Sequence, residues 1–190
     1  EIGYPIMAKA SAGGGGRGMR LIKEESEFDQ LFMAASSEAL AAFGDGTMYL
    51  ERFINNPRHI EVQVVGDSHG NAIHIGERDC SLQRRHQKVI EESPAILLND
   101  ETRAKLHDVA VKATKYLKYE GAGTFEFLAD DKQNIFFMEM NTRLQVEHPV
   151  SEMVSGIDIV ELMIKVAEGE KVPPQESIKF KGHAIECRIT

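Results

Sequence analysis

The segment FFMEMNTRLQVEHP, residues 136–149 of this 190-residue chain, decides how the rest of the sequence is interpreted. Its polar residues fall at successive odd positions: Glu139, Asn141, Arg143, Gln145 and Glu147. The apolar residues between them are predicted to face a core: Phe136, Met138, Met140, Leu144 and Val146. In extended chain, residues two apart point to the same side. The segment therefore predicts a strand with one apolar face and one face that presents acid, amide, base, amide and acid.

A second strand is predicted just before this segment, at residues 122–129, joined to it by the polar turn DDKQ. If the turn centres on its last two residues, Glu126 lies opposite Glu139 and Thr124 lies opposite Asn141. Like charges directly opposed destabilise a sheet unless a cation lies between them. Mg²⁺ takes one or two carboxylates together with substrate phosphates. The pair is thus either a magnesium site or an exposed pair of glutamates in a slightly different register.

Two other groups of polar residues allow both a chemical and a structural interpretation. Arg143 could hold a small oxyanion through its planar fork while Glu147 accepts a proton from it, or the two could form a plain salt bridge. The segment SLQRRHQKVIEE, residues 81–92, alternates three basic residues: Arg84, His86 and Lys88. These side chains could meet phosphates, or the segment could be a solvated basic loop.

The segment KASAGGGGRGMR, residues 9–20, joins two further strand candidates, IMAKAS and MRLI. It satisfies G-x-G-x-x-G, but MRLI has the pattern of a returning strand rather than of the helix that a dinucleotide fingerprint requires. Glycines let backbone N–H groups approach an anion closely, and Lys9, Arg17 and Arg20 add positive charge. We interpret the segment as a flap over phosphates, with a floppy surface turn as the alternative.

Hydrophobic spacing elsewhere predicts helices at residues 26–43, 100–117 and 158–168. The last of these is apolar nearly all round, which predicts burial. Alternating or apolar runs predict further strands at residues 48–54, 59–67, 71–77 and 182–189. The order of these elements predicts an α+β fold, with mostly antiparallel hairpins rather than a regular βαβ alternation.

Composition and sequence patterns exclude several classes of protein. A formal charge of -8 argues against a nucleic-acid partner, which requires a basic face. No apolar run reaches the ~18 residues of a membrane span, and no signal-peptide pattern opens the chain. Cys80 and Cys187 match no metal-ligand spacing and favour a reducing compartment. Because the chain starts at Glu1 and stops at Thr190 directly after a strand-like segment, we expect a fragment of a longer cytoplasmic protein.

These segments together resemble the biotin carboxylase subunit or domain of biotin-dependent carboxylases. The resemblance rests on GYP, KASAGGGGRGMR, ERFINNPRHIEVQV, ERDCSLQRRHQKVIEE, GAGTFEF, MEMNTRLQVEHPVSEM and GHAIECRI, which follow one another over nearly the whole chain. RRHQK and EMNTRLQVEHPV separate the sequence from other ATP-grasp ligases. The resemblance implies an ATP-grasp fold in which residues 1–53 form a lid with a glycine-rich loop at 12–18. Residues 54–190 would be part of the larger, truncated C-terminal subdomain with the metal-bearing sheet.

The resemblance implies an ATP-dependent ligase that carboxylates biotin with bicarbonate through carboxyphosphate. The implied cofactors are ATP, Mg²⁺ or Mn²⁺, and biotin as the carried substrate. The implied partners are a biotin carboxyl carrier protein and a carboxyltransferase, with a homodimer in the full-length protein. Acetyl-CoA, and hence acetyl-CoA carboxylase and fatty acid biosynthesis, is the default acceptor, and pyruvate is the second. The fragment alone is expected to bind ATP weakly and to be inactive.

The resemblance also assigns roles to individual residues. ATP would contact Lys9, Gly15, Gly16, Met19, Glu51, Arg52, Phe53, His59, Gln83, His86 and Leu128. The metal would be held by Glu126, Glu139 and Asn141. Bicarbonate would be seated by Arg143, Gln145, Val146 and Glu147. The catalytic residues would be Glu147 as the base, Arg143, and Lys88 facing the transferred phosphoryl group.

Two residues depart from the family pattern: Ala12 stands where many members have glycine, and Arg52 stands where lysine is common. The alternatives are another ATP-grasp ligase, of the carboxylate–amine or carbamoyl-phosphate type, and a non-catalytic nucleotide-binding module. The module is disfavoured because it would not need Glu147.

Overall fold

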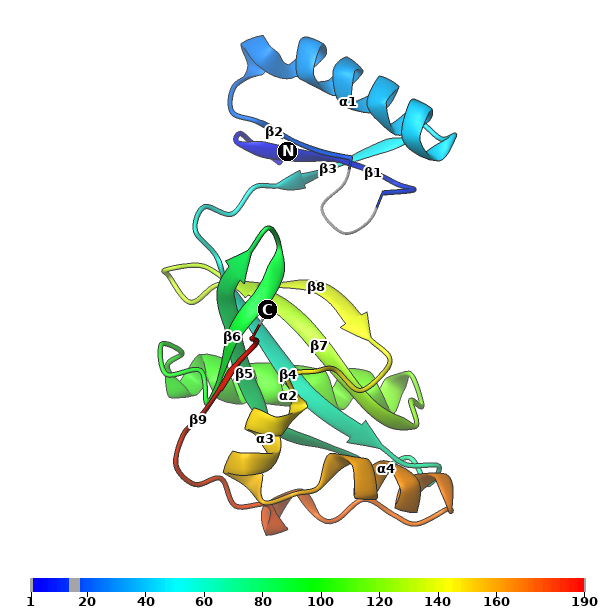
Figure 1. Ribbon diagram of the computed structural model, residues 1–190, viewed down its shortest axis with the longest axis vertical. Coiled ribbons are helices and arrows are strands. Elements are labelled where there is room, and N and C mark those ends of the chain that lie inside the picture. Colours follow the sequence, from blue (N-terminus) through cyan, green and yellow to red (C-terminus); the bar gives the residue numbers. More distant parts are fainter. Residues whose placement is uncertain (1, 14–17, 190) are drawn as a thin grey trace. The chain divides into compact units, whose positions relative to one another are not determined.

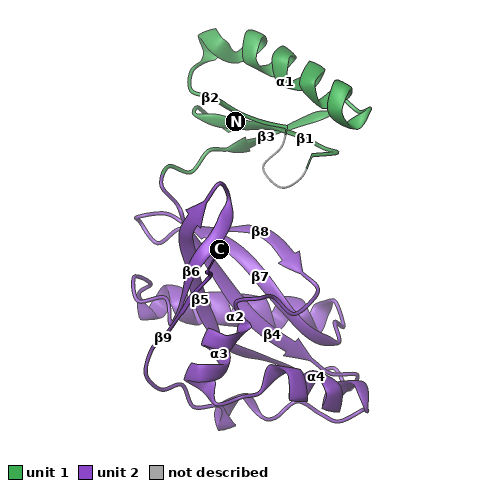
Figure 2. Ribbon diagram, viewed as in Figure 1, with its two compact units in different colours: residues 1–55 green, residues 56–190 purple. Residues whose placement is uncertain are grey.

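The computed structural model describes residues 2–13 and 18–189, and the chain divides into two compact units, residues 1–55 and 56–190 (Figure 2). In the described part, no helix is both long and apolar enough to cross a membrane. The predicted α+β class is confirmed: helices pack on two antiparallel sheets.

The first unit is a small sheet in the order β2-β1-β3, covered by one long helix. Its strands are β1 (Ile6–Ala10), β2 (Met19–Ile22) and β3 (Met48–Arg52), and both pairings are antiparallel. Helix α1 (Phe28–Phe43) follows the short 3-10 helix η1 (Glu25–Glu27) and ends at Gly44. Gly44 has a φ of 75°, a left-handed conformation that glycine adopts without strain.

The second unit is a six-stranded antiparallel sheet in the order β8-β7-β4-β5-β6-β9. Its strands are β4 (Arg58–Gly66), β5 (Ala72–Arg84), β6 (Gln87–Ser93), β7 (Gly121–Ala129), β8 (Ile135–Asn141) and β9 (Ala184–Cys187). Its helices are α2 (Asp100–Tyr116), α3 (His148–Ser155), α4 (Ile159–Ala167) and the 3-10 turn η2 (Gln175–Ser177).

The two faces of this sheet pack against different helices (Figure 1). Helix α2 covers one face, where Leu106 and Ala110 pack in a core with Ile60, Val62 and Phe125. Helices α3 and α4 cover part of the other face, where the apolar core is formed by Val65, Ile73, Ile75, Ala122, Ile159, Leu162 and Val166. Because side chains alternate along a strand, the even-numbered residues of β4 face α2 and the odd-numbered ones face α3 and α4.

The β7–β8 hairpin confirms the predicted register at the two polar pairs. Glu126 lies opposite Glu139, and Thr124 lies opposite Asn141. Nearer the turn, however, Phe127 pairs with Phe137, so that one residue, Met138, is inserted on β8. Near the turn the pairing is therefore shifted by one residue from the predicted register, and this bulge restores the predicted register before the glutamates.

The bulge and the end of β8 explain why the predicted apolar face is only partly correct. Met138 is 43% exposed because the insertion breaks the alternation, and Val146 is 60% exposed because β8 ends at Asn141. The expectation that both face the core was wrong. The prediction of all-round burial for the last helix was also wrong, since Val160 and Ile164 on α4 are exposed.

Two elements were not predicted. The basic segment at residues 81–92 is a hairpin rather than a loop, because β5 continues to Arg84 and β6 returns from Gln87. Its turn residues, Arg85 and His86, both have positive φ, of 52° and 63°, as a tight two-residue hairpin turn requires. Helix α3, which directly follows Glu147, was too short to give a periodic signal.

Candidate functional site

The polar centre of the second unit is formed around the ammonium group of Lys88, which β6 directs across the sheet face that also holds α3. Its Nζ lies 2.9 Å from Glu126 Oε1 on β7 and 2.6 Å from Glu147 Oε1 just before α3. It also forms an ion pair with Glu61 on β4. Three carboxylates from separate elements thus converge on one cation. Burial alone would lower the pKa of Lys88, but Glu61 and the other two acids raise it above its usual range.

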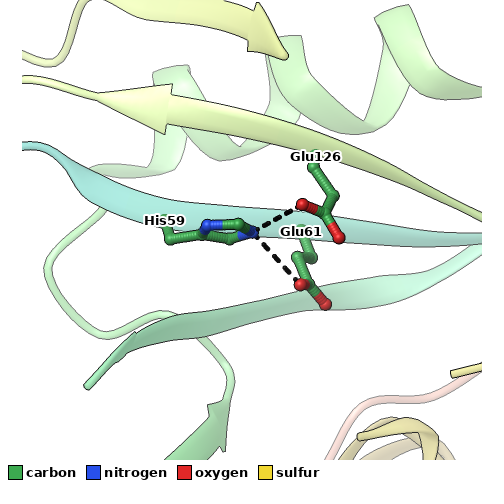
Figure 3. A group of neighbouring side chains, drawn as sticks. All are labelled: His59, Glu61 and Glu126. Carbon is green, nitrogen blue, oxygen red and sulfur yellow. Dashed lines mark ion pairs between the residues drawn. The ribbon is translucent and has the colours of Figure 1, made fainter. Parts of the chain in front are cut away.

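His59 lies beside two of these acids (Figure 3). Its Nε2 is 2.9 Å from Glu126 Oε2 and 3.3 Å from Glu61 Oε1. Burial would lower the pKa of His59, but its contacts with Glu126 and Glu61 outweigh burial and raise the pKa to about 9. Burial likewise opposes ionisation of Glu61, yet Arg78 and its other cationic neighbours hold its pKa well below the usual range. This part of the site is therefore fully ionised at neutral pH.

The segment after β8 supplies two amides to the same centre. Asn141 Nδ2 donates to Glu126 Oε1 at 2.8 Å, and Gln145 Nε2 donates to the same oxygen at 2.9 Å. Arg143 is exposed, and among the described residues it donates only to Asn141 Oδ1, at 3.3 Å, and to the Leu144 carbonyl. The alternative of an Arg143–Glu147 salt bridge does not hold, because Glu147 pairs with Lys88 and Arg188 instead.

Other residues predicted to contact nucleotide lie along the rim of this centre. Gln83 Nε2 is 3.3 Å from His59 Nδ1 and donates to the carbonyl of Cys80. Leu128 lies opposite His59 in the β4–β7 pair. His86 is exposed in the β5–β6 turn. The structure thus groups these side chains around the edge where β4, β5 and β7 meet, apart from the exposed His86.

The remaining predicted nucleotide residues belong to the first unit. Lys9 on β1 forms an ion pair with Glu51 on β3, and Met19 on β2 pairs directly with Lys9. Arg52 is the last residue of β3, and the backbone N–H of Phe53 donates to the Pro5 carbonyl. Gly15 and Gly16 lie outside the described residues, as does Arg17.

The donor atoms on β7 and β8 fit a magnesium ion. Glu126 and Glu139 face each other across the hairpin, and Asn141 follows on the same strand, so all three supply the hard oxygen ligands that Mg²⁺ prefers. Two other groups of residues each bring their possible ligand atoms within 4.8 Å of one another. The first group is His59, Glu61 and Glu126, and the second is Glu61, Cys80 and Glu147. These groups contain nitrogen or sulfur, and burial raises the pKa of the Cys80 thiol far above neutrality. The oxygen set is thus the better match.

Three charged residues of the site were missed by sequence reasoning: Glu61, Arg78 and Arg188. Arg188 Nη2 lies 2.8 Å from Glu147 Oε2, and its Nε lies 2.7 Å from the buried Glu91. Glu61 lies opposite Arg78 on one side and Glu126 on the other. His59 and Glu61 lie two apart on the predicted strand at 59–67, but Arg78 lies just beyond the predicted strand at 71–77, and β7 and β9 come from distant parts of the chain. A cross-strand pairing of that kind leaves no local signal.

Comparison with known proteins agrees with this geometry. The family model described as carbamoyl-phosphate synthase L chain, ATP binding domain, matches residues 1–175. A curated relative, the biotin carboxylase of Nostoc sp., is 55% identical over 190 residues, which are 100% of this chain and 42% of that protein.

Solved structures give the same result. A biotin carboxylase-β-γ-ATP complex from Campylobacter jejuni has a TM-score of 0.91 and 68% identity, covering 98% of this chain and 42% of that one. The biotin carboxylase domain dimer of Hydrogenobacter thermophilus 2-oxoglutarate carboxylase was solved with MgADP, ADP and bicarbonate. It has a TM-score of 0.89 and 54% identity, with 98% of this chain and 42% of that chain covered. The chain therefore spans less than half the length of these proteins.

Proposed function

The chain belongs to the family of the carbamoyl-phosphate synthase L chain ATP-binding domain, and from this premise we propose that it forms the central ATP-binding part of a biotin carboxylase. In this reaction, bicarbonate attacks the γ-phosphorus of ATP to give carboxyphosphate and ADP. Carboxyphosphate then breaks down to phosphate and CO₂, and the CO₂ bonds to N1 of biotin as N1 loses its proton. The observation that supports this function best is the convergence of Glu61, Glu126 and Glu147 on Lys88.

Lys88 has the charge and position to stabilise phosphoryl transfer. Negative charge develops on the transferred group, and a fixed ammonium stabilises it without rearranging at the moment of reaction. Because Glu61 and the other two acids outweigh burial and raise the pKa of Lys88, its charge is retained at neutral pH. We assign Lys88 to the transferred phosphoryl group, with His59, Gln83, His86 and Leu128 contacting the nucleotide.

Bicarbonate binding is assigned to the segment between β8 and α3. The exposed guanidinium of Arg143 can reach a small oxyanion through its planar fork, and Gln145 and the backbone at Val146 would complete the seat. Glu147 is the base that takes the bicarbonate proton. Both of its oxygens are held, one by Lys88 and the other by Arg188, which fixes the carboxylate in one orientation.

Glu126, Glu139 and Asn141 would hold Mg²⁺, with Mn²⁺ as the second candidate. The ion, when bound, neutralises charge on the phosphates of ATP. In the first unit, Lys9, Gly15, Gly16, Met19, Glu51, Arg52 and Phe53 are assigned to ATP. We assign residues 1–53 to the lid and residues 54–190 to part of the larger subdomain.

The wider context of the reaction is also a proposal. Biotin would arrive on a carboxyl carrier protein, and a carboxyltransferase would pass the carboxyl group to the final acceptor. Acetyl-CoA, in a cytoplasmic acetyl-CoA carboxylase of fatty acid biosynthesis, is our first choice of acceptor. Pyruvate is the second. We also propose that the full-length protein is a homodimer.

The direct test is bicarbonate-dependent ATP hydrolysis by the protein that contains this chain, with and without free biotin. We expect biotin to stimulate ADP release and to be carboxylated in step with it. Glu147→Gln should abolish turnover while leaving ADP affinity within about twofold, because the base is separate from the nucleotide contacts. Hydrolysis that ignores biotin would instead favour a carboxylate–amine or carbamoyl-phosphate type ligase. If the unaltered protein binds ADP but hydrolyses no ATP, the result would favour a nucleotide-binding module.

The metal assignment has its own test. Calorimetry of ATP binding with and without Mg²⁺ should show metal-dependent affinity that the double variant Glu126→Gln, Glu139→Gln loses. A matched control is Glu161→Gln, an exposed acid of α4 far along the chain from the site. Equal metal dependence in the double variant would remove the assignment.

A further inference from the structure

One arginine holds much of the polar centre together and has no role in the chemistry described above. Arg78 on β5 is fully buried. All three of its guanidinium nitrogens donate hydrogen bonds, at 2.7 to 3.2 Å, to acceptors on other segments of the second unit. The acceptors are Glu61 Oε2, Gln63 Oε1, Thr124 Oγ1, Gln145 Oε1 and Ser151 Oγ. Arg78 therefore contacts β4, β7, the segment before α3, and α3 itself.

The chemistry of arginine makes this network directional. A guanidinium has donors and no acceptor, whereas a side-chain amide has one of each. Arg78 Nη2 donates to Gln145 Oε1 at 3.2 Å, so the NH₂ group of Gln145 must point the other way, where it donates to Glu126 Oε1 at 2.9 Å. Arg78 Nη1 fixes Gln63 in the same manner, and Gln63 Nε2 donates to the Gly123 carbonyl. A residue without obligatory donors would leave both amides free to rotate.

Arg78 also divides the two oxygens of Glu61 between different tasks. Its Nε and Nη2 both donate to Glu61 Oε2, at 3.1 and 2.9 Å. The other oxygen, Oε1, is left for Lys88 and for His59 at 3.3 Å. The position of Lys88 in the site thus depends on the Glu61 carboxylate, which Arg78 holds through the oxygen that faces away from Lys88.

We propose that Arg78 is a positioning residue that orients Gln145 and Glu61, and through them the bicarbonate seat and Lys88. This role rests on the proposed function. A buried charge network is seldom needed for stability alone, because apolar residues of similar volume often serve as well. Here the network connects both amides and one acid to a single rigid group, which is what an ordered site requires.

The test compares Arg78→Lys with Arg103→Lys in the protein that contains this chain. Arg103 is a matched control because it donates to the buried Glu77 and to two carbonyls on the opposite face of the sheet, away from the site. Lysine keeps the charge but has one nitrogen and cannot reach all the acceptors. We expect Arg78→Lys to raise the bicarbonate KM and lower kcat, reducing kcat/KM for bicarbonate about a hundredfold, with the ATP KM changed far less. Arg103→Lys should leave both KM values and kcat unchanged.

A milder pair of variants covers the case in which Arg78→Lys does not fold. Ser151→Ala removes one acceptor of Arg78, whereas Ser155→Ala on the same helix removes a hydroxyl that bonds backbone groups of α3 and the Ile157 N–H and does not contact Arg78. We expect the first to lower kcat/KM for bicarbonate about fivefold and the second to leave it unchanged. Equal kinetics within each pair would overturn the proposal. If the unaltered protein lacks biotin-stimulated hydrolysis, the proposed function fails instead. A crystal structure of Arg78→Lys or Ser151→Ala then still tests the positioning role. The proposal requires that Gln145 rotate or become disordered in the variant, and an unchanged Gln145 would contradict it.

Discussion

The two faces of the six-stranded sheet each bury a charge network, and the two networks are built differently. Consecutive residues of β5, Glu77 and Arg78, point to opposite faces and form the centre of one network each. On the α2 face, Glu77 receives hydrogen bonds from Arg103 Nε at 2.8 Å and from the Ala95 N–H, and lies 2.7 Å from His107 Nε2. One acid there is surrounded by donors.

On the opposite face, three acids share their cations. Glu61, Glu126 and Glu147 all contact Lys88, and only Glu61 pairs directly with Arg78. A network in which every acid has its own partners is complete, and it serves to join α2 to the sheet. In the Lys88 network each acid also has a further cationic neighbour, Arg78, His59 or Arg188, but all three acids share Lys88, which can exchange one of these contacts for a phosphate. The difference separates a structural from a functional use of buried charge.

The largest effect that the comparison predicts is on turnover. Lys88→Met removes the cation that three carboxylates share, and we expect kcat to fall by about a thousandfold or more, as for loss of a main electrostatic contact to a transition state. The measurement is bicarbonate-dependent ATP hydrolysis with ADP affinity determined in parallel. Lys112→Met is the control, since Lys112 forms an exposed ion pair with Asp108 on α2. A Lys88→Met protein that retained a tenth of the turnover would contradict the assigned role.

The second effect is on stability and belongs to the α2 face. Glu77→Gln leaves Arg103 and His107 without their buried acid, and we expect the free energy of unfolding to fall by about 3 kcal/mol while kcat of the folded protein stays unchanged. Urea denaturation measures the loss. Glu161→Gln, which breaks an exposed pair with Lys165, should cost less than about 1 kcal/mol. A kinetic defect in Glu77→Gln would show that the faces are coupled.

The sequence predicted the local parts of this molecule better than the distant ones. The β7–β8 hairpin could be predicted because its strands are adjacent in the chain, and its register brought Glu126 opposite Glu139. The compensating bulge at Met138 could not be predicted, since nothing in the residue types marks it. The helices α1 and α2 were readable from their apolar spacing, whereas the eight-residue α3 was not.

The site shows the same limit. The hairpin register and the alternation beyond it placed Glu126, Asn141 and Gln145 on one face, but they could not reveal the contact of Arg78 with Glu61, Thr124 and Gln145. That contact depends on β4 pairing with both β5 and β7, which lie far apart in the sequence. Pairings of that kind follow from the packing of the whole sheet, so a pattern within one segment cannot encode them.

The third prediction uses one histidine from each face, whose pKa values move in opposite directions. Burial and the neighbouring His107 lower the pKa of His74 to about 4, while the acids around His59 overcome burial and raise its pKa to about 9. The contribution of His74 is present above pH 6.5 and is lost as the pH falls toward 4. The contribution of His59 is present below pH 6.5 and is lost as the pH rises through 9.

Stability without metal or nucleotide should therefore be greatest near pH 6.5 and fall by about 2 kcal/mol on either side. Urea denaturation across this range tests the curve. His59→Gln should flatten only the alkaline decline, and His74→Gln only the acid decline down to pH 4. Below that, the acid decline continues in both variants, because hydrogen bonds to His107 and Arg103 outweigh burial and lower the pKa of Glu77 to about 2. A variant that flattened the opposite limb would contradict the assignment of either histidine.

The smallest effect concerns the start of α2, where a change should alter stability and nothing else. Asn99 caps the helix, and its side chain accepts a hydrogen bond from the Thr102 N–H at 2.7 Å. Asn99→Ala should lower the free energy of unfolding by about 1 kcal/mol, because that N–H loses its partner. Glu101→Ala, two residues along the same turn and exposed, is the control and should cost only a few tenths of that. Both variants should retain the kcat and both KM values of the unaltered protein, since α2 packs on the sheet face that does not hold Lys88. A change in the bicarbonate KM would mean that a shift of α2 alters the position of Arg78 through β5.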